Sequence, residues 1–409
     1  PTGTCVGLEP WPDHPFLRRR ARQDRPRSAA VEQCISHQAP LPVIHHERAG
    51  ANAVLNQPFL PGWLYRDEEI HRVDCTLYAN HFWHPVAAAS DLRPGQSLAI
   101  TLLHQPLLLT WPEAEQPRAF RNRCPHRGVA FQADGEAGKP CRRLICPYHG
   151  WTYNLQGDLL AATRESDFEH GFDRQAWGLH ELPCRLDGPL IWVSLNAQAI
   201  SLDEQLALVH DTSNIPWSAA PIQLRQVQRS LACNWKIAHD NTLDDYHVAI
   251  AHPKTLHREQ GPVRQYVHRF SRYGNLLETP HPDGGRFLTF GLPPWSHLLV
   301  WPDGRIALLE FLPNLSSHCT MQLRLFAPSE TVNNPSADAW LEQLLAFLEE
   351  DRVLVESAQR GYDDTFNPGP PHRLEQRILH WQSIYRSQLS TVAGNKLERN
   401  QDAISTLRT

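Results

Sequence analysis

Two short stretches of this chain each place a cysteine and a histidine almost side by side in loop-forming sequence. The first stretch, NRCPHRG, carries Cys124 and His126, and the second, CPYHGW, carries Cys146 and His149. In each motif a proline follows the cysteine and a glycine stands four residues after it, a combination that favours tight turns with free backbone N–H groups. We therefore expect both pairs to lie at loop tips that meet around one metal site.

The arrangement of the four donors indicates which metal site this is. Zinc fingers group cysteine with cysteine and histidine with histidine, whereas here each loop supplies one of each. The mixed pattern suits a [2Fe–2S] cluster of the Rieske type, with two thiolates on one iron and two imidazoles on the other. The alternatives are a zinc loop or an accidental spacing. Cys141 imitates a ferredoxin C-x4-C with Cys146, but the C-x2-C that should follow is absent, so we interpret Cys141 as a bystander.

Length and composition limit the remaining possibilities. With 409 residues the chain exceeds the size at which one hydrophobic core stops growing, so two domains are expected. A net charge of −5 favours neither nucleic acid nor an anionic membrane, and no apolar run is long enough to span a bilayer. The nine cysteines are scattered and odd in number, which favours a reducing compartment. We expect a cytoplasmic protein with no nucleic-acid or membrane partner.

The pattern along the chain predicts an α+β protein in three parts. Residues 1–55 form a poorly ordered, arginine-rich arm, residues 56–197 an all-β domain with a leading helix at about 60–78, and residues 198–409 a second domain. Runs such as SLAITLL, LLLTW and GPLIWVSL predict short strands in the first domain. The second domain is expected to combine a helix over 235–251, strands over 286–290, 297–301, 306–312 and 319–327 with a PDG hairpin turn, and helices over 336–360 and 372–389.

A second metal site is suggested by NWKIAHDNTLDDYHVAIAHP. On a continuous helix Asp244 and His247 are three residues apart and share a face, while His252 lies at the helix end before Pro253. Two imidazoles and one carboxylate on one face of an iron are the ligands of oxygen-activating Fe(II) proteins. His239 and His257 do not have this spacing, so we place them at the surface or behind the ligands. Asp245 is interpreted as a solvated neighbour.

The missing carboxylate has one candidate in the late helix. Asp351 falls on the apolar stripe of that helix, where a carboxylate is unfavourable unless it is paired or binds a metal. Pairing with an arginine, with Arg352 adjacent, and coordination of a metal are equally supported by periodicity alone.

These motifs closely resemble those of the Rieske non-haem iron, aromatic-ring-hydroxylating oxygenases, in their large (alpha) terminal oxygenase component. Beyond the two Cys/His loops, the family pattern N-x2-D-x2-H-x4-H is met by Asn241, Asp244, His247 and His252, and a late ED-x4-E-x2-Q-x-G begins at Glu350. The resemblance implies that Cys124, His126, Cys146 and His149 bind the cluster and that His247, His252 and Asp351 bind one mononuclear Fe(II). Asp240 stands where the family commonly has Glu.

The resemblance also implies a fold and a mechanism. The catalytic domain would be helix-grip-like, with an antiparallel sheet and flanking helices. Asp244, with Asn241 beside it, would be the catalytic acid that links His247 to His149 of a neighbouring subunit in a homotrimer. Electrons would come from an external NAD(P)H-dependent reductase, with or without a ferredoxin, because no GxGxxG or complete plant-type ferredoxin motif occurs in the chain.

The substrate is the least determined part of the prediction. The main interpretation is mono- or dioxygenation of an aromatic ring, and Phe287, Phe290 and Leu298 are candidate pocket residues. One alternative is an alkylamine or quaternary ammonium substrate, as in choline-monooxygenase-like members, which LPGWLYRDEEI loosely resembles. A Rieske electron carrier with a vestigial second site is a different class, disfavoured by the intact iron-ligand set. A chlorophyll-catabolic oxygenase is weakened by the lack of a membrane anchor and a C-terminal cysteine pair.

Overall fold

The computed structural model describes residues 58–134, 139–168, 171–213, 215, 217, 222–328 and 337–389. The arginine-rich arm predicted for 1–55 lies outside these residues, which all belong to one compact unit. Within the described part of the chain, no helix is both long and apolar enough to cross a membrane.

A succession of short helices opens the described chain, as the sequence predicts for 60–78. The elements are η1 (Gly62–Tyr65), α2 (Glu68–Val73), η2 (Asp74–Tyr78) and η3 (Ala79–His81). Asp67 begins α2 because its side chain accepts from two backbone N–H groups of the first turn. The buried Asp74 then accepts hydrogen bonds from Trp235 and Tyr385, which ties this segment to helices far along the chain.

Three small antiparallel sheets follow, confirming the predicted all-β character of this part. Their strand orders are β1-β11-β10, β5-β2-β3-β4-β9 and β6-β7-β8. The elements of this part are β1 (Trp83–Ala88), η4 (Ala89–Asp91), β2 (Gln96–Leu102), β3 (Gln105–Trp111), β4 (Arg118–Arg121), β5 (Lys139–Pro140), β6 (Leu144–Ile145), β7 (Thr152–Tyr153), β8 (Leu159–Ala161), η5 (Glu165–Asp167), η6 (Arg174–Trp177), β9 (Glu181–Leu182), β10 (Cys184–Asp187) and β11 (Leu190–Ser194). The two Cys/His loops flank β6, one before it and one between β6 and β7.

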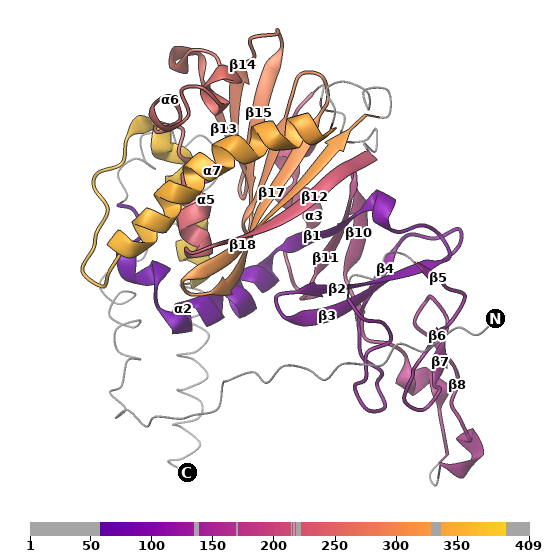
Figure 1. The fold of residues 1–409 in the computed structure, drawn as a ribbon. Coiled ribbons are helices and arrows are strands. Elements are labelled where there is room, and N and C mark those ends of the chain that lie inside the picture. Colours follow the sequence, from indigo (N-terminus) through magenta and orange to yellow (C-terminus); the bar gives the residue numbers. More distant parts are fainter. Residues whose placement is uncertain are drawn as a thin grey trace, which may run out of the picture. The chain divides into compact units, whose positions relative to one another are not determined.

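The second half of the chain is built on one seven-stranded antiparallel sheet of order β12-β18-β17-β16-β15-β14-β13 (Figure 1). After α3 (Leu202–Gln205) and α4 (Ala207–Asp211), its strands are β12 (Ile222–Leu231), β13 (Val267–Phe270), β14 (Asn275–Pro280), β15 (Arg286–Leu292), β16 (Ser296–Val300), β17 (Ile306–Leu315) and β18 (His318–Ala327). The predicted strands are all present. The PDG turn joins β16 to β17, with Gly304 at a φ of 86° that favours glycine.

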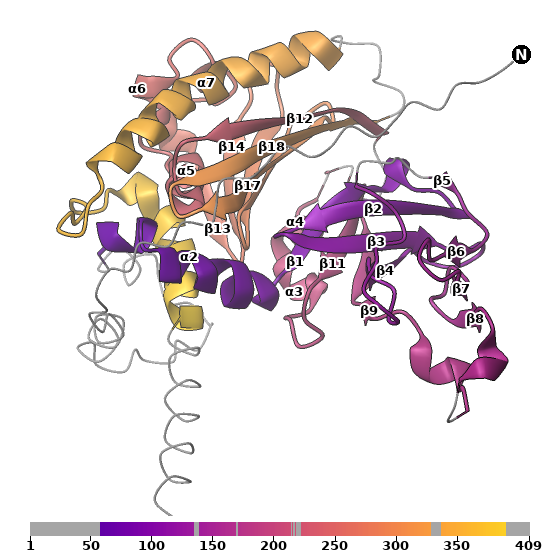
Figure 2. The ribbon, with the colours of Figure 1, turned by 60° about the horizontal axis from the view of Figure 1, so that its bottom comes forward.

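Helices cover one face of this sheet, where α5 and α7 pack together (Figures 1 and 2). The helices are α5 (Trp235–Leu243), α6 (Val248–Ala251), η8 (Leu256–Arg258), η9 (Val263–Gln265), α7 (Ala337–Gly361) and η11 (Arg373–Glu375), followed by a helix over 376–389. The predicted α+β class is confirmed. The single helix expected over 235–251 is wrong, because the chain leaves helical geometry between α5 and α6.

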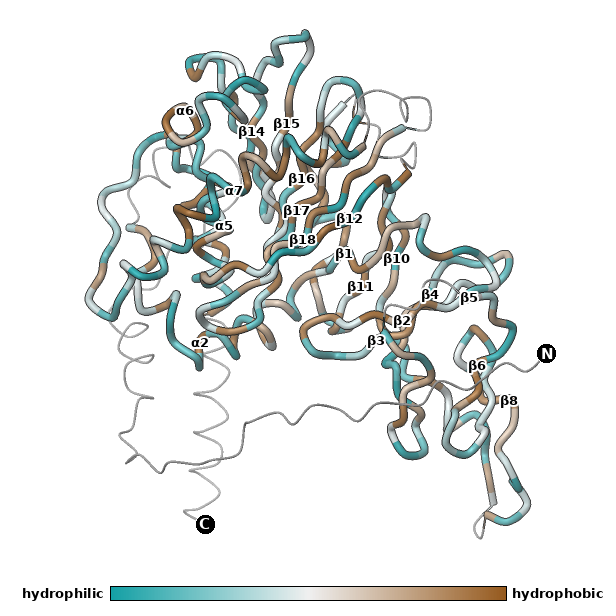
Figure 3. The backbone as a smooth tube through the Cα atoms, in the orientation of Figure 1, coloured by the Kyte–Doolittle hydropathy of each residue, from teal (hydrophilic) through white to brown (hydrophobic). Residues whose placement is uncertain are grey.

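Alternation along the strands separates two apolar layers, and the hydrophobic colour in Figure 3 is concentrated in the sheet strands. Phe290, Leu298 and Leu308 pack with Trp192 of β11 in one buried cluster. The neighbours of these sheet residues along each strand point to the opposite face, toward α5 and α7. The helix-covered face therefore receives Thr289, His297, Leu299 and Leu309, which bear on the site described next.

Candidate metal centres and the adjoining pocket

The two Cys/His loops have the same backbone form. In each, the cysteine N–H donates to the carbonyl five residues later, and the glycine four residues later donates back to the cysteine carbonyl, at 2.8–3.0 Å. Gly128 and Gly150 have φ values of 77° and 69°, which a side chain disfavours. The prolines and glycines of the motifs thus fold each pair locally into a loop tip.

The four donors face a common interior. Cys124 and Cys146 are 2% and 3% exposed, and the rings of His126 and His149 lie 4.5 Å apart between centroids. The Nδ1 atoms of both histidines are buried and lack a hydrogen-bond partner among the described residues. Two buried thiols with two unpartnered imidazole nitrogens are the donor set that a mixed-ligand [2Fe–2S] cluster requires, so the residues fit this group.

The electrostatics of these loops favour neutral imidazole. Partial burial, the neighbouring His149 and the Arg127 guanidinium together lower the pKa of His126. Burial raises the pKa of the Cys124 thiol, and the adjacent Cys146 raises it further. A positively charged iron centre would therefore have to stabilise the thiolates, as metals do in cysteine sites.

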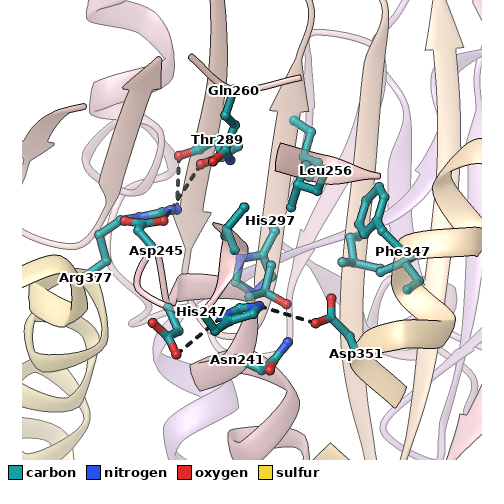
Figure 4. A pocket seen from close by; sticks show the side chains of 16 residues that line it. Asn241, Asp245, His247, Leu256, Gln260, Thr289, His297, Phe347, Asp351 and Arg377 are labelled. Atoms are coloured by element: carbon teal, nitrogen blue, oxygen red, sulfur yellow. Dashed lines mark hydrogen bonds and ion pairs between the residues drawn. The ribbon is translucent and has the colours of Figure 1, made fainter. Parts of the chain in front are cut away.

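The second donor set is assembled from α6 and α7. Donor atoms of His247, His252 and Asp351 all lie within 4.8 Å of one another. The two histidine Nε2 atoms are 3.1 Å apart, and Asp351 Oδ1 lies 2.9 Å from His252 Nε2 and 3.4 Å from His247 Nε2. Figure 4 shows His247 and Asp351 facing each other beside the pocket. Two imidazole nitrogens directed at one point, with a carboxylate, form the facial set expected for Fe(II).

Each histidine has an acidic partner on its other ring nitrogen. Asp244 Oδ2 lies 3.3 Å from His247 Nδ1, and Glu350 Oε2 lies 2.7 Å from His252 Nδ1. Carboxylates in this position fix the tautomer and orientation of metal-binding histidines. Glu350 in turn accepts from the Thr255 hydroxyl at 2.6 Å, so the acid itself is held in place.

The charges of this site call for a cation. Burial lowers the pKa of His247, but the hydrogen bonds and charges of Asp244 and Asp351 outweigh it and raise the pKa to about 10. Burial likewise raises the pKa of Asp351, and the two histidines more than reverse this, so that its pKa lies below the usual range. A divalent metal would supply the positive charge that protonated His247 supplies in the metal-free protein. The residues therefore fit a mononuclear iron.

Local geometry explains how the broken helix still brings Asp244 to His247. Asp244 ends α5 with a ψ of 100°, and its Oδ1 accepts from the Tyr246 N–H at 2.8 Å. The chain turns at this point, and α6 then begins directly after His247 and ends directly before His252. The predicted pairing is therefore present, although not through a shared helical face.

The alternative of an Asp351–arginine pair is not what the structure shows. Arg352 forms its ion pairs with Glu349 and Glu356 on the outer side of α7. Asp351 instead points to the two histidines and is largely enclosed between them. The directions of the Asp351 and Arg352 side chains therefore favour metal coordination by Asp351 over an ion pair with arginine.

Asp245 is not the solvated residue that the sequence suggested. It is 5% exposed and lies 3.0 Å from Arg377 Nη1 and 2.8 Å from His268 Nε2. Arg377, 1% exposed, also donates to Asn275 and Thr289. Arg377 lies three residues after Leu374 and four before Trp381, on the predicted apolar stripe of the last helix, which was the sequence signal that this charge is buried.

The neighbours of the ligand motif are also buried. His239 is 2% exposed, so a surface position is wrong, and its Nδ1 lies 2.8 Å from His297 Nε2. Asp240, which stands where the family commonly has Glu, accepts hydrogen bonds from Tyr65, Trp381 and Gln382. Its side chain therefore holds neighbouring segments of the fold together.

A pocket adjoins the mononuclear donor set, and the pocket candidates named from the sequence, Phe287, Phe290 and Leu298, do not line it.

 The pocket holds about 510 Å³ of space, part of it open to solvent. Its lining combines Asn241, Thr242, Asp244, Asp245, His247, Val248, Leu256, Gln260, Thr289, His297, Leu299, Leu309, Phe347, Leu348, Asp351 and Arg377. Phe290 and Leu298 belong to the other face of the sheet, and Phe287 packs on Trp301 instead. Strand alternation, once the register is known, identifies the correct neighbours.

Family models match both halves of the chain. The model described as a Rieske [2Fe-2S] domain matches residues 82–170, and the model of the ring hydroxylating alpha subunit (catalytic domain) matches residues 217–391. The first covers both Cys/His loops, and the second covers the mononuclear donor set and the pocket.

Two curated relatives extend over most of the chain. It is 27% identical over 376 residues to the glycine betaine monooxygenase oxygenase subunit of Chromohalobacter salexigens, covering 77% of this chain and 82% of that protein. It is 26% identical over 296 residues to the carnitine monooxygenase oxygenase subunit of Acinetobacter pittii, covering 68% of this chain and 78% of that one.

Solved structures share the fold. A quaternary ammonium Rieske monooxygenase in complex with L-carnitine matches with a TM-score of 0.71 at 20% identity, covering 84% of this chain and 99% of that one. Naphthalene 1,2-dioxygenase from Rhodococcus sp. matches with a TM-score of 0.67 at 16% identity, covering 83% and 96%. At these identities the likeness establishes the fold alone.

Proposed function

Since this chain belongs to the Rieske non-haem iron oxygenases, as a large (alpha) terminal oxygenase component, we propose that it hydroxylates a small quaternary ammonium compound. The observation that carries the substrate class is the similarity to oxygenase subunits named for glycine betaine and carnitine. This favours the alternative from the sequence over the main interpretation of an aromatic ring.

The family carries a Rieske [2Fe–2S] cluster and a mononuclear iron and draws its electrons from an external reductase. When bound, the cluster supplies one-electron transfer and the mononuclear iron supplies the reaction with O2. The balance is R–H + O2 + two electrons + two protons giving R–OH + H2O. We assign the cluster to Cys124, His126, Cys146 and His149, and the iron to His247, His252 and Asp351.

The side chains around the proposed iron site have separate tasks. Glu350 orients His252, and Asp244 holds the proton on His247 Nδ1. Val248, Leu256, Phe347 and the other apolar lining residues keep bulk water from the substrate, while Thr289 and Gln260 add polar groups. A compact pocket whose wall combines apolar side chains with polar ones suits a small substrate with a bulky, methylated ammonium group.

The route of the electrons is proposed to cross between subunits of a homotrimer, from the cluster of one chain to the iron of the next. Contact between subunits would cover exposed aromatic and aliphatic side chains that stand beside both proposed metal sites. Tyr148, between two cluster donors, is 61% exposed, and Tyr246 and Ile250, beside and between the iron-binding histidines, are 54% and 84% exposed. Such surfaces commonly mark protein interfaces. Asp244, on the same turn as Tyr246, would then contact His149 of the neighbouring subunit.

A substrate screen tests the proposed function. The reconstituted protein, supplied with a reductase and NAD(P)H, is offered glycine betaine, carnitine, choline, benzoate and naphthalene. We expect oxygen uptake matched by stoichiometric hydroxylated or demethylated product with at least one of the first three compounds and with neither aromatic. Coupled oxidation of benzoate or naphthalene alone would return the assignment to ring hydroxylation. Iron analysis should give three irons per chain, whereas two would indicate an electron carrier.

A further inference from the structure

His297 lines the pocket from the sheet side but belongs to no motif identified in the sequence. It lies on β16 and is 1% exposed, and Figure 4 shows it next to His247. Its Nε2 is 2.8 Å from Nδ1 of His239 on α5. Its other nitrogen, Nδ1, is buried and has no hydrogen-bond partner within the described part of the chain. A buried, unpartnered polar atom in a pocket wall calls for a ligand group to satisfy it.

The two histidines are a neutral pair. Burial lowers the pKa of His239 to about 3, and burial together with His239 holds the pKa of His297 well below its usual value. A neutral pair linked through one N–H has two arrangements. Either His239 donates to His297 and leaves a donor N–H on His297 Nδ1, or His297 donates to His239 and leaves an acceptor there.

The chemistry of the proposed substrate selects one arrangement. A quaternary ammonium group carries no N–H, so it cannot donate to an acceptor nitrogen. The carboxylate of a betaine can only accept when it is ionised. We propose that His297 is a substrate-binding residue whose Nδ1–H donates to a carboxylate oxygen of the substrate, while His239 holds its ring and tautomer from behind. This rests on the proposed function and narrows it to carboxylated quaternary ammonium compounds.

The other polar groups of the wall are less available for this task. Arg377 is engaged by Asp245, Asn275 and Thr289, and the Gln260 amide oxygen accepts from the Tyr266 hydroxyl at 2.5 Å. Asp244 and Asp351 would repel a carboxylate and face the proposed metal. Nδ1 of His297 is therefore a buried atom of this wall that can donate, lacks a partner among the described residues and lies on no proposed metal ligand.

Binding measurements on the full-length protein with both metals test the proposal. Under anaerobic conditions, dissociation constants are measured for glycine betaine and for its methyl ester, which keeps the ammonium group and removes the negative charge. Wild-type protein should prefer the betaine, and His297→Leu should weaken betaine binding about ten- to hundredfold while changing ester binding little, as expected for one hydrogen bond to a charged group.

Two conservative variants distinguish substrate binding by His297 from a structural role through its contact with His239. His297→Asn retains an amide near Nδ1 and should restore much of the preference for the betaine. His297→Gln places its amide near Nε2, toward His239, and should not. Restoration by Gln rather than Asn would show a structural role and overturn the proposal. His318→Leu, at an exposed histidine, is the matched control. Iron content and the melting temperature are measured for every variant.

The outcomes for this inference and for the proposed function are distinguishable. If wild-type protein oxidises quaternary ammonium compounds but binds the betaine and its ester equally, the role of His297 is wrong and the function stands. If it binds neither compound and oxidises no quaternary ammonium substrate, the function fails and this inference fails with it.

Discussion

The two proposed metal sites of this protein are built in opposite ways. The cluster donors sit on two loops of identical hydrogen-bonding form, each closed within six residues of sequence. The iron donors come from a turn near His247 and from α7, about a hundred residues later, and depend on how α7 packs on α5. One site is specified locally and repeated, and the other exists only in the folded domain. The difference predicts that each site can be lost without the other.

The largest effect that would test this difference between the two sites is expected when the Asp351 carboxylate is removed from α7. Asp351→Ala should release the mononuclear iron and lower oxygen-dependent product formation about a thousandfold or more, because the reaction of O2 depends on that metal. The locally built cluster should remain, with its paramagnetic signal on reduction unchanged. Measurements are iron content, the spectrum of the reduced protein and turnover.

The matched control for this change is Glu349→Gln, two residues earlier on α7, where the carboxylate is exposed and pairs with Arg352. It should leave both metals and turnover intact. Product formation that survives in Asp351→Ala would overturn the assignment of the ligand set.

A smaller effect is expected from Asp244, the acid proposed to link the two sites. Asp244→Asn should lower turnover about ten- to hundredfold, the usual effect of changing the carboxylate behind a metal-binding histidine, while three irons per chain remain. If electrons pass between subunits through this residue, single-turnover experiments with a prereduced cluster should show slowed cluster oxidation. Unchanged cluster oxidation together with weakened iron binding would assign Asp244 to His247 alone.

The locally built site was predicted more completely than the packed one. The loop tips at Cys124 and Cys146 follow from proline and glycine within each motif, so sequence sufficed. The sequence also selected His247 and Asp351, whose donor atoms the structure brings together. The continuous helix through Asp244 was wrong, since an aspartate side chain can accept from the backbone N–H of Tyr246 and end a helix.

The errors at the pocket have a related cause. The partner of Asp245 is Arg377, more than a hundred residues away, and no local pattern connects them. Phe290 and Leu298 were assigned to the pocket because strand alternation gives two faces without saying which of them the helices cover. His297 was missed for the same reason. Long-range packing, rather than local propensity, decides these positions.

The two sites should also differ in how metal binding depends on pH. In the metal-free protein the pKa of His247 is raised to about 10, so its ion pairs stabilise the folded state below the ordinary histidine pKa and are lost as the pH rises through about 10. A metal must displace that proton. Co²⁺ affinity at this site should therefore increase about tenfold per pH unit for the one proton released, over pH 7 to 9.

The cluster side provides the contrast, because the neighbouring groups lower the pKa of His126 instead of raising it. Co²⁺ titration of cluster-loaded protein, followed by d–d absorption, measures the dependence. Asp244→Asn, which removes one of the charges that raise the pKa of His247, should make the affinity level off at a lower pH. An affinity independent of pH would contradict the charge balance described for this site.

The smallest effect should distinguish the two cluster loops from each other. Gly128 and Gly150 both have positive φ, so alanine at either position should cost about 1 kcal/mol of backbone strain. A Cβ on Gly128 meets nothing within 4 Å, whereas on Gly150 it lies 2.9 Å from the Thr163 hydroxyl, which donates to the His149 carbonyl. Gly150→Ala should therefore lower the melting temperature more than Gly128→Ala and perturb the cluster spectrum near His149. Equal effects would mean that the backbone alone, without the Thr163 contact, sets the geometry of the second loop.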